Sequence, residues 1–271
     1  MQTESAPKSY MKQLTLHVGD ETQILERARE SSHSTEIVVA PVELHRRNLQ
    51  RRLREDDSPK DAFEFEDFVG LSQTVVGNRE FPTEAFDRID RLAAVRGILD
   101  DSADSAEAPG SLPAAARQQD PQNVEQIRAD VESVTNFSPE RIAAYRETAA
   151  GLYEPIDAET EELLDTAVEI ERRLRANTSK SVSEMELVRR ATRFLIWSSG
   201  YAWTDLYPDV NRVTVVGLSS ISAPQADFIH ALLKSTSLDV HVHLRERTGE
   251  YLRRRIPSLL EVENPGREIF E

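Results

Sequence analysis

The chain has 271 residues, of which 39% are hydrophobic, carries a formal net charge of −15 and contains no cysteine. That length can bury one large core or two modest ones, and the missing cysteine excludes disulfides, thiolate zinc sites and a cysteine nucleophile. Residues 1–12 are polar, and no run approaches the roughly 20 apolar residues of a membrane-spanning helix. We therefore expect a folded, cytoplasmic protein with no membrane partner.

Strands and helices alternate in the first part of the chain. Residues 13–18 alternate apolar and polar, which predicts a strand, and a helix follows with Asp20 expected as its cap. Residues 36–40 form an apolar run typical of a strand buried on both faces, and a helix is expected over 41–55. This order predicts an α/β fold with a parallel sheet.

The next segments are shorter and end in a polar stretch. Residues 63–68 predict a short strand that runs into a helix near 69–76, and residues 83–99 have amphipathic helical spacing that includes Ile89. Residues 100–122 combine Asp, Ser, Ala, Pro, Gly and Gln with almost no large apolar residues, so we expect a flexible linker there.

The middle of the chain has a helical pattern throughout, and Ser183 with Glu186 matches a capping box. Its four expected helices are short enough to pack as a bundle and span 124–134, 139–152, 158–176 and 183–198. Strands at 213–216 and 238–244 and helices at 223–235 and 249–260 then complete the sheet. The expected organisation is a flexible tail at 1–12, sheet halves at 13–99 and 208–262, the linker at 100–122, a helical insertion at 123–207 and a tail at 263–271.

The basic residues are unusual because only five are lysine and 28 are arginine, against 48 acidic residues. This composition resembles that of cytoplasmic proteins from salt-loving archaea, where molar counterions screen the repulsion between surface carboxylates. Since proteins in such cells are acidic as a rule, the net charge is only weak evidence against nucleic-acid binding.

Two local motifs point to a family. Phe65-Glu-Asp-Phe68 looks like the helicase motif Thr-Phe-His-Ser-Phe, and Val216 to Gln225 looks like the Asp-Glu box with its downstream Gln. In that order and spacing, residues 13–260 resemble the first motor domain of superfamily 1 helicases. The resemblance is greatest to the inactive N-terminal helicase-like region of the AddAB B subunit, whose Asp-Gly-Phe version fits Gly217, Leu218 and Pro224. It implies a parallel sheet of the P-loop NTPase type with an inserted helical lobe.

The residues for ATP chemistry are missing at both matching places. A P-loop needs several glycines, a lysine and a Ser or Thr, whereas this chain offers Val18-Gly-Asp-Glu-Thr22. Asp20 and Glu21 would place negative charge beside the phosphates, and we expect them to cap the helix instead. Val216 and Gly217 stand where the acids would hold Mg²⁺. We therefore predict no catalytic residue, cofactor or bound metal, and only vestigial nucleotide positions at Gly19, Asp20, Glu21, Thr22, Val216, Gly217 and Gln225.

Two arginine clusters are the candidate DNA contacts, because guanidinium groups bind phosphates through paired hydrogen bonds. The candidates are Arg46, Arg47, Arg51 and Arg52 in one helix and Arg253, Arg254 and Arg255 in another. Tyr251 could stack on a base. The alternative is a solvated helix surface, with the first cluster paired to Glu43, Glu55 and Asp56.

Other polar residues have competing interpretations. His241 and His243 share a strand face with Asp239, and His17 could join them in a metal site, although packed histidines are the favoured interpretation. His33, His45 and His230 have no evident partners and are expected at the surface. We favour Ser219, Ser220 and Ser222 as turn and capping residues over a nucleophile, and Trp197, Tyr201, Trp203 and Tyr207 as packing residues over a stacking site.

The resemblance favours a non-catalytic, helicase-like scaffold or DNA-binding subunit in DNA repair or recombination. Its expected partner is a nuclease or helicase subunit, with DNA as a further ligand. The alternatives are an α/β enzyme that binds a nucleotide or hydrolyses another substrate at the carboxyl ends of its strands, and a protein-interaction module without a DNA role.

Overall fold

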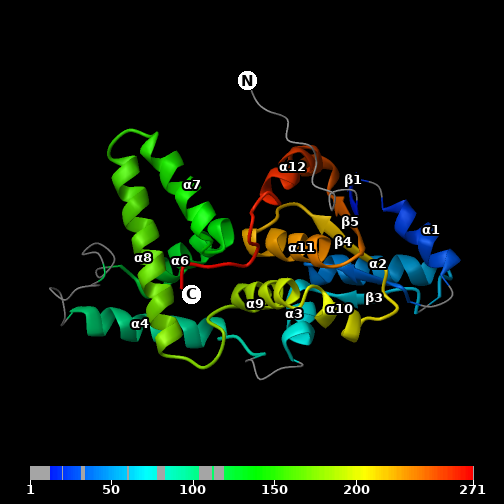
Figure 1. The fold of residues 1–271 in the computed structure, drawn as a ribbon, viewed down its shortest axis with the longest axis horizontal. Helices are drawn as coiled ribbons and strands as arrows, with labels where there is room; N and C mark the ends of the chain where they lie inside the picture. The colour runs from blue at the N-terminus through cyan, green and yellow to red at the C-terminus, as the bar shows by residue number, and fades with distance from the viewer. Residues whose placement is uncertain are drawn as a thin grey trace. The chain divides into compact units, whose positions relative to one another are not determined.

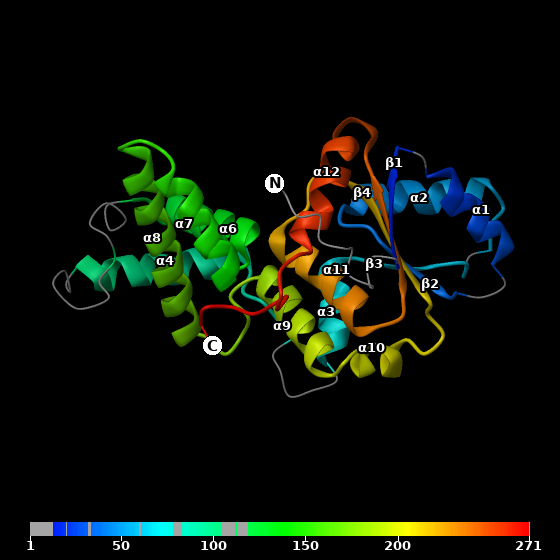
Figure 2. The same cartoon turned by 45° about the horizontal axis from the view of Figure 1, so that its top comes forward.

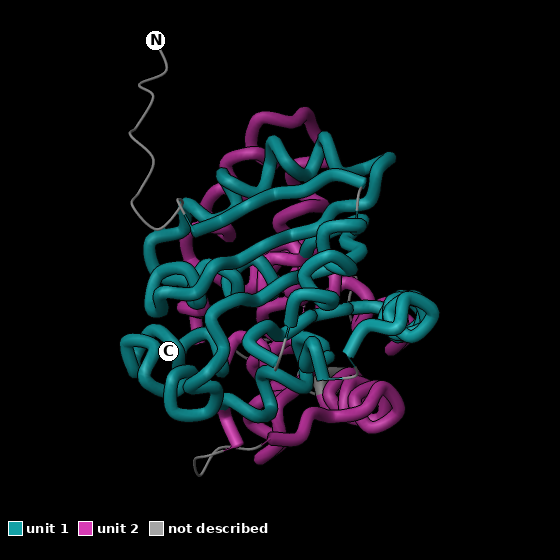
Figure 3. The backbone as a smooth tube through the Cα atoms, turned by 90° about the vertical axis from the view of Figure 1, so that its right-hand side faces the viewer, with its two compact units in different colours: residues 1–75, 191–221, 225–265 teal, residues 76–190, 222–224, 266–271 magenta. Residues whose placement is uncertain are grey.

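The computed structural model describes residues 13–19, 21–31, 34–59, 61–77, 83–103, 112 and 119–270. The chain forms two compact units, which Figure 3 shows in different colours. Unit 1 comprises residues 1–75, 191–221 and 225–265, and unit 2 comprises 76–190, 222–224 and 266–271. Every described helix is too short or too polar to cross a bilayer.

Unit 1 is built on a five-stranded sheet in which all neighbouring strands are parallel (Figure 1). The strand order is β1-β5-β4-β2-β3. The strands are β1 (Leu14–Val18), β2 (Glu36–Val39), β3 (Glu64–Glu66), β4 (Arg212–Leu218) and β5 (Asp239–Leu244). The predicted α/β class and all five predicted strands are confirmed, because alternating and fully apolar runs identify strands from local sequence.

One face of the sheet is apolar and lies against α12 (Glu246–Leu259) and α11 (Ala223–Ser235), which Figure 2 shows on one side of the strands. Gly249 lets α12 come close, since a Cβ there would lie 2.7 Å from Cγ1 of Val18 and 3.0 Å from Cβ of Leu244. Phe228 of α11 packs edge-on against Phe68, the first residue of α3 (Phe68–Gly77), at 6.0 Å between ring centroids.

The opposite face packs against α1 (Thr22–Glu30) and α2 (Glu43–Glu55). Its apolar part joins residues of both helices to β2 and β4 in one core: Ile24, Ala28, Leu49, Leu53, Val38, Ala40 and Val216. Its polar part contains Glu36, whose carboxylate accepts hydrogen bonds from Arg27 at 3.0 and 2.9 Å and from Thr214 at 2.5 Å. Partnered in this way, the Glu36 charge can be buried in the sheet.

Unit 2 is helical, as predicted. Its helices are α4 (Arg88–Ala103), α6 (Pro121–Thr135), α7 (Pro139–Ala150), α8 (Ile156–Ala176) and the first half of α9 (Glu184–Trp197), whose second half belongs to unit 1 with α10 (Tyr201–Leu206). The capping box is confirmed. Ser183 Oγ accepts from the Glu186 N–H at 3.0 Å, and the Glu186 carboxylate accepts from the Val182 N–H at 2.5 Å.

The structure differs from the prediction between residues 83 and 122. The helix expected from Thr83 begins at Arg88, because Ala85 instead forms a parallel bridge with Ser181, and Ile89 is 78% exposed. The linker expected at 100–122 is helical up to Ala103 and again from Pro121. Leu112 is buried in a core with α4, α6 and α8, whereas the rest of that stretch, 104–111 and 113–118, lies outside the described residues.

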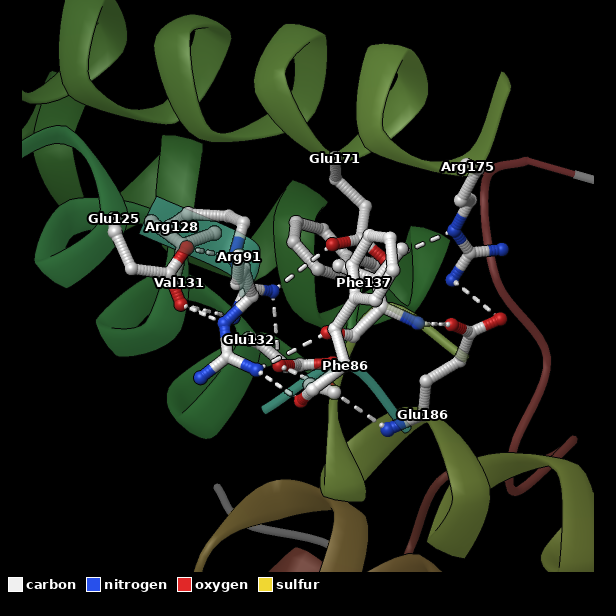
Figure 4. Close-up of polar contacts among 12 residues, drawn as sticks. Phe86, Arg91, Glu125, Arg128, Val131, Glu132, Phe137, Glu171, Arg175 and Glu186 are labelled. Atoms are coloured by element: carbon white, nitrogen blue, oxygen red, sulfur yellow. Dashed lines mark hydrogen bonds and ion pairs between the residues drawn. The ribbon is translucent and has the colours of Figure 1, made fainter. Parts of the chain in front are cut away.

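A buried network of ion pairs connects the helices of unit 2 (Figure 4). Arg128, fully buried on α6, donates hydrogen bonds to Glu125 at 2.7 Å, Glu132 at 3.0 Å and Glu171 of α8 at 2.9 Å. Burial by itself would lower the pKa of Arg128, but the surrounding carboxylates raise it well above its ordinary value. Arg189 of α9 completes the network through ion pairs with Glu132 and, at 2.6 Å, with Glu268.

The segment expected to be a tail, 263–271, is bound to unit 2 from Gly266 onward. Glu268 is only 3% exposed and also accepts hydrogen bonds from Arg175 at 2.9 and 2.7 Å. Phe270 packs edge-on against Phe137 at 5.2 Å, and the Arg175 guanidinium lies 4.5 Å from the Phe270 ring centroid. Charge pairing and aromatic packing therefore hold in place the described end of a segment that was expected to be a tail.

Replacing Arg128 by Met should destabilise unit 2 by about 3–5 kcal/mol, because three carboxylates would lose their shared buried partner. Urea unfolding followed by far-UV circular dichroism measures this, since both tryptophans lie in unit 1. The control is Arg172→Met, which removes an exposed pair with Glu169 and should cost no more than about 1 kcal/mol. Equal losses in the two variants would contradict the expected role of the network.

Candidate nucleotide site at the carboxyl edge of the sheet

The connection between β1 and α1 is too short to wrap around phosphates. Only residues 19–21 separate the two elements, whereas the P-loop pattern is about eight residues long. Gly19 turns sharply with φ +86°, and its N–H donates to the Leu244 carbonyl at 2.9 Å. Asp20, the predicted cap, lies outside the described residues.

Glu21 does not cap α1 as predicted. Its side chain makes no hydrogen bond to the helix; instead Oε1 lies 3.0 Å from Nε2 of His45, and Oε2 accepts from Arg52 at 3.1 Å. Burial acts to raise the pKa of Glu21, but His45 and Arg52 outweigh it and lower the pKa below its ordinary value. Glutamate is not a preferred N-cap residue, and here its side chain reaches α2.

Gly217 has a conformation and a neighbour that both favour glycine. Its φ is +71°, and the sheet register shifts between Val215 and Leu218. A Cβ at this position would lie 2.7 Å from Cδ2 and 2.8 Å from Nε2 of His45. The carbonyl of Gly217 accepts from Nε of Arg245 at 3.0 Å. The His45 ring therefore occupies the space that a side chain at position 217 would enter.

The other positions that the sequence suggested as remnants of a nucleotide site, which are Val216, Thr22 and Gln225, lie in a helix or in the core. Val216 is fully buried in the core below α1 and α2. Thr22 is the first residue of α1, and Gln225 is half-buried in the first turn of α11. Mg²⁺ prefers carboxylate and phosphate oxygens, and positions 216 and 217 provide no carboxylate. Positions 216 and 217 therefore do not fit the metal that phosphoryl transfer uses, and the Glu21 carboxylate is paired with His45 and Arg52.

His45 is the residue that the sequence prediction missed. It was expected at the surface without a partner, but it contacts both Glu21 and Gly217. His230, also expected at the surface, is buried at 1% exposure, and His33 lies outside the described residues. The useful signal was the position of His45 in the first turn of a helix that follows a buried strand, because that turn faces the carboxyl edge of a parallel sheet.

The four candidate arginines of α2 have acidic neighbours, whereas Arg54 of the same helix donates to the Gln50 carbonyl at 3.2 Å. Arg46 and Arg47 pair with Glu43, Arg51 lies 3.8 Å from Glu55, and Arg52 pairs with Glu21. Asp56, the third expected partner, pairs with Arg29 of α1 instead. The cluster is thus largely neutralised within the protein.

The arginines of α12 are more open. Arg253 lies 3.7 Å from Glu250, an exposed pair. Arg254 and Arg255 are exposed and have no acidic partner among the residues that the structure describes. Tyr251 is 67% exposed on the same helix. Residues three and four apart share a helix face, so Tyr251 lies beside Arg254 and Arg255.

The sheet brings together three of the four residues considered for a metal site. His17, His241 and His243 are neighbours on β1 and β5, whereas Asp239 is exposed at the start of β5 and lies 3.8 Å from Arg212. Burial lowers the pKa of His17, with a further contribution from Arg27. Burial, followed by Arg212 and Arg27, lowers the pKa of His241 to about 4. Both imidazoles are therefore neutral at pH 7.

Some of the serines and aromatic residues considered above are packed inside the protein, and others are exposed. Ser219 and Ser220 are exposed after β4, and Ser222 Oγ lies 3.9 Å from the Met185 sulfur. Trp203 is buried 4.8 Å from Tyr207, which agrees with the packing prediction. Trp197 and Tyr201 were expected to pack as well, but they are 74% and 66% exposed.

These features define an α/β protein with a five-stranded parallel sheet and a helical second unit. The sequence model of the family described as Halobacterial UvrD-like protein matches residues 1–271, so the chain belongs to that family. Membership confirms a helicase-like relationship, and the halobacterial description agrees with the acidic, arginine-rich composition. No curated protein matches the chain.

Replacing Gly217 by Ala should destabilise unit 1 by at least about 1–3 kcal/mol, because of its positive φ and the contact with His45. Denaturant unfolding followed by tryptophan fluorescence measures this, because Trp197 and Trp203 both lie in unit 1. The loss should be smaller when His45 is also Ala, since only the backbone strain remains. Gly97→Ala is the control, because a Cβ there meets open space within its helix. Strictly additive losses for Gly217→Ala and His45→Ala would contradict the contact.

Proposed function

We propose that this protein is a non-catalytic, helicase-like scaffold in DNA repair or recombination that acts beside a nuclease or helicase subunit. Family membership supports the helicase-like part of the proposal. The loss of catalysis rests on the carboxyl edge of the sheet, where ATPases of this architecture bind nucleotide. At that edge the protein has its own side chains in place of the phosphate loop and the acidic box.

The observation that carries the proposal is the contact of His45 with both Glu21 and Gly217. Glu21 follows β1, where a phosphate loop would stand, and Gly217 is in β4, where an acidic residue would hold Mg²⁺. One imidazole thus bridges the two positions that ATP and its metal would share. An anionic phosphate would also meet the Glu21 carboxylate, which electrostatics disfavours.

The finer relationship that we propose is to the inactive N-terminal region of the AddAB B subunit. Gly217, Leu218 and Pro224 support it, because they match that region better than they match an active helicase. The parallel sheet is compatible with the P-loop NTPase type. In such an assembly this chain would position DNA or its partner while the other subunit performs the chemistry.

Calorimetric titration of the full chain with ATP and Mg²⁺ in molar potassium chloride should show no binding at millimolar nucleotide. We expect this because the side chains of His45 and Glu21 occupy the carboxyl edge of the sheet where a nucleotide would bind. Glu21→Gln removes the repelling charge and tests whether charge alone prevents binding; we expect no binding in this variant either, because His45 remains against Gly217. Millimolar or tighter binding by the unmodified protein would overturn the non-catalytic assignment and favour a nucleotide-binding enzyme.

The part of the proposal that concerns DNA rests on α12. Arg254 and Arg255 are exposed without described acidic partners, and Tyr251 offers an exposed ring beside them. The candidate arginines of α2, which are Arg46, Arg47, Arg51 and Arg52, are weaker candidates because each of the four already has a carboxylate neighbour. A helix that combines guanidinium groups with an aromatic ring suits single-stranded nucleic acid, since phosphates and base faces are both available.

Filter binding of single- and double-stranded DNA over a range of salt concentrations tests this surface. The pair Arg254→Ala and Arg255→Ala should weaken binding and reduce the salt slope by about one unit for each lost phosphate contact. The matched control is Arg146→Ala with Arg172→Ala, which removes two arginines paired on unit 2. Undetectable DNA binding by the unmodified protein at every salt concentration would favour a protein-interaction module.

A further inference from the structure

We propose that His17, His241 and His243 form a binding site for a first-row transition metal ion of the zinc type, held between β1 and β5. This proposal does not depend on whether the protein binds a nucleotide, because the site consists of imidazoles on two neighbouring strands. Three of the six histidines in the chain gather here.

The parallel register of β1 and β5 places the three histidines on one face. His17 is the register partner of His243, and Thr15 is the partner of His241. Residues two apart in a strand point to the same side, so His241 joins His243 and His17 there. This is the face that carries Glu36 and Thr214, whereas the other face carries apolar residues such as Val240 and Val242.

The imidazole nitrogens are already close together. One ligand atom from each histidine lies within 4.8 Å of the others, and Nε2 of His17 is 3.1 Å from Nδ1 of His241. The His17 ring stacks on His243 at 4.2 Å between centroids with 13° between the planes. Tetrahedral zinc with bonds of about 2.0–2.1 Å places its ligand nitrogens about 3.3–3.4 Å apart. One pair is thus already near that separation, whereas the stacked His17 and His243 rings would have to turn out of their parallel arrangement before both could direct a nitrogen at the same ion.

The charges around the histidines could oppose a cation, because Arg27 and Arg212 lie on the same face. Arg27 is held by Glu36 through two hydrogen bonds, and Arg212 lies 3.8 Å from the same carboxylate. The positive charge of Arg27 is therefore offset before an ion enters. Asp239 does not contribute a ligand atom to the cluster, so the donor set consists of three imidazoles.

This donor set determines the class of ion. Imidazole nitrogens suit zinc, copper, nickel and cobalt, whereas Mg²⁺ and Ca²⁺ require oxygen ligands. Three protein ligands leave a fourth position for water or another small ligand. Because β1 is the edge strand of the sheet, an ion bound here would attach that edge to β5 and stabilise it.

The test uses the full, untagged chain, freed of metal with a chelator and kept in molar potassium chloride. Calorimetric titration with ZnCl₂ should show one ion bound per chain, and Co²⁺ should give the visible absorption of tetrahedral coordination. Zn²⁺ should also slow amide hydrogen exchange in β1 and raise Tm, since binding to the folded state stabilises it. Loss of an outer-shell partner typically reduces metal affinity about 10- to 100-fold. His17→Ala and His241→Ala each remove a direct ligand, so each should reduce the affinity for Zn²⁺ by at least that factor.

Thr15→Ala is the matched control, because it changes the same edge strand beside His241 without removing a nitrogen ligand. Circular dichroism without metal verifies that each variant is folded, and His17→Gln provides a second variant if His17→Ala is not. Zn²⁺ binding that survives unchanged in the folded histidine variants would assign the ion to surface carboxylates and overturn the proposal. Absence of binding by the unmodified chain would leave a packed histidine cluster and overturn it as well.

Discussion

The contact between the His45 ring and the backbone of Gly217 is the constraint on which the packing at the carboxyl edge of the sheet depends. It favours glycine at 217, because a Cβ there would lie 2.7 Å from Cδ2 of the ring and the backbone has a φ of +71°. In this position the His45 ring also contacts the Glu21 carboxylate, which forms an ion pair with Arg52. Side-chain contacts therefore connect three elements at this edge: the start of α1, one face of α2 and the end of β4. A side chain at position 217 would therefore require the His45 ring to move away from its place beside Glu21.

The strands and most helices could be predicted because their signals are local. Residues 37–40 and 213–218 are apolar except for Thr214, and the helices of unit 2 carry apolar residues at helical spacing. The prediction failed where a distant segment determined the local structure. The helix expected from Thr83 begins five residues later because Ala85 bridges to Ser181, nearly a hundred residues away along the chain. Such a partner leaves no trace in the periodicity of residues 83–99.

At the candidate nucleotide site, the sequence shows which motif residues are missing, but it does not show which side chains contact one another. The missing lysine and acids are visible in the sequence, whereas the pairing of Glu21 with His45 depends on how α1 and α2 pack. Strand alternation correctly placed His241 and His243 on one face, but the position of His17 beside them depends on the pairing of β1 with β5. Alternation also could not show that Asp239 lies 3.8 Å from Arg212. The buried network was missed for a related reason. Glu125, Arg128 and Glu132 have the spacing of a solvated ion-paired face, and only Glu171 from another helix shows that they are buried.

The position of Glu268 has a consequence for the order in which the protein forms during synthesis. This carboxylate is the partner of Arg189, which precedes it by 79 residues. At about 5–20 residues per second, the ribosome needs about 4–16 s to make the intervening chain. During that time the buried guanidinium of Arg189 and the half-buried guanidinium of Arg175 lack this partner, while β4 and β5 are synthesised. The helical unit is therefore completed only after the last strand of the sheet has been made, although most of its residues are made earlier.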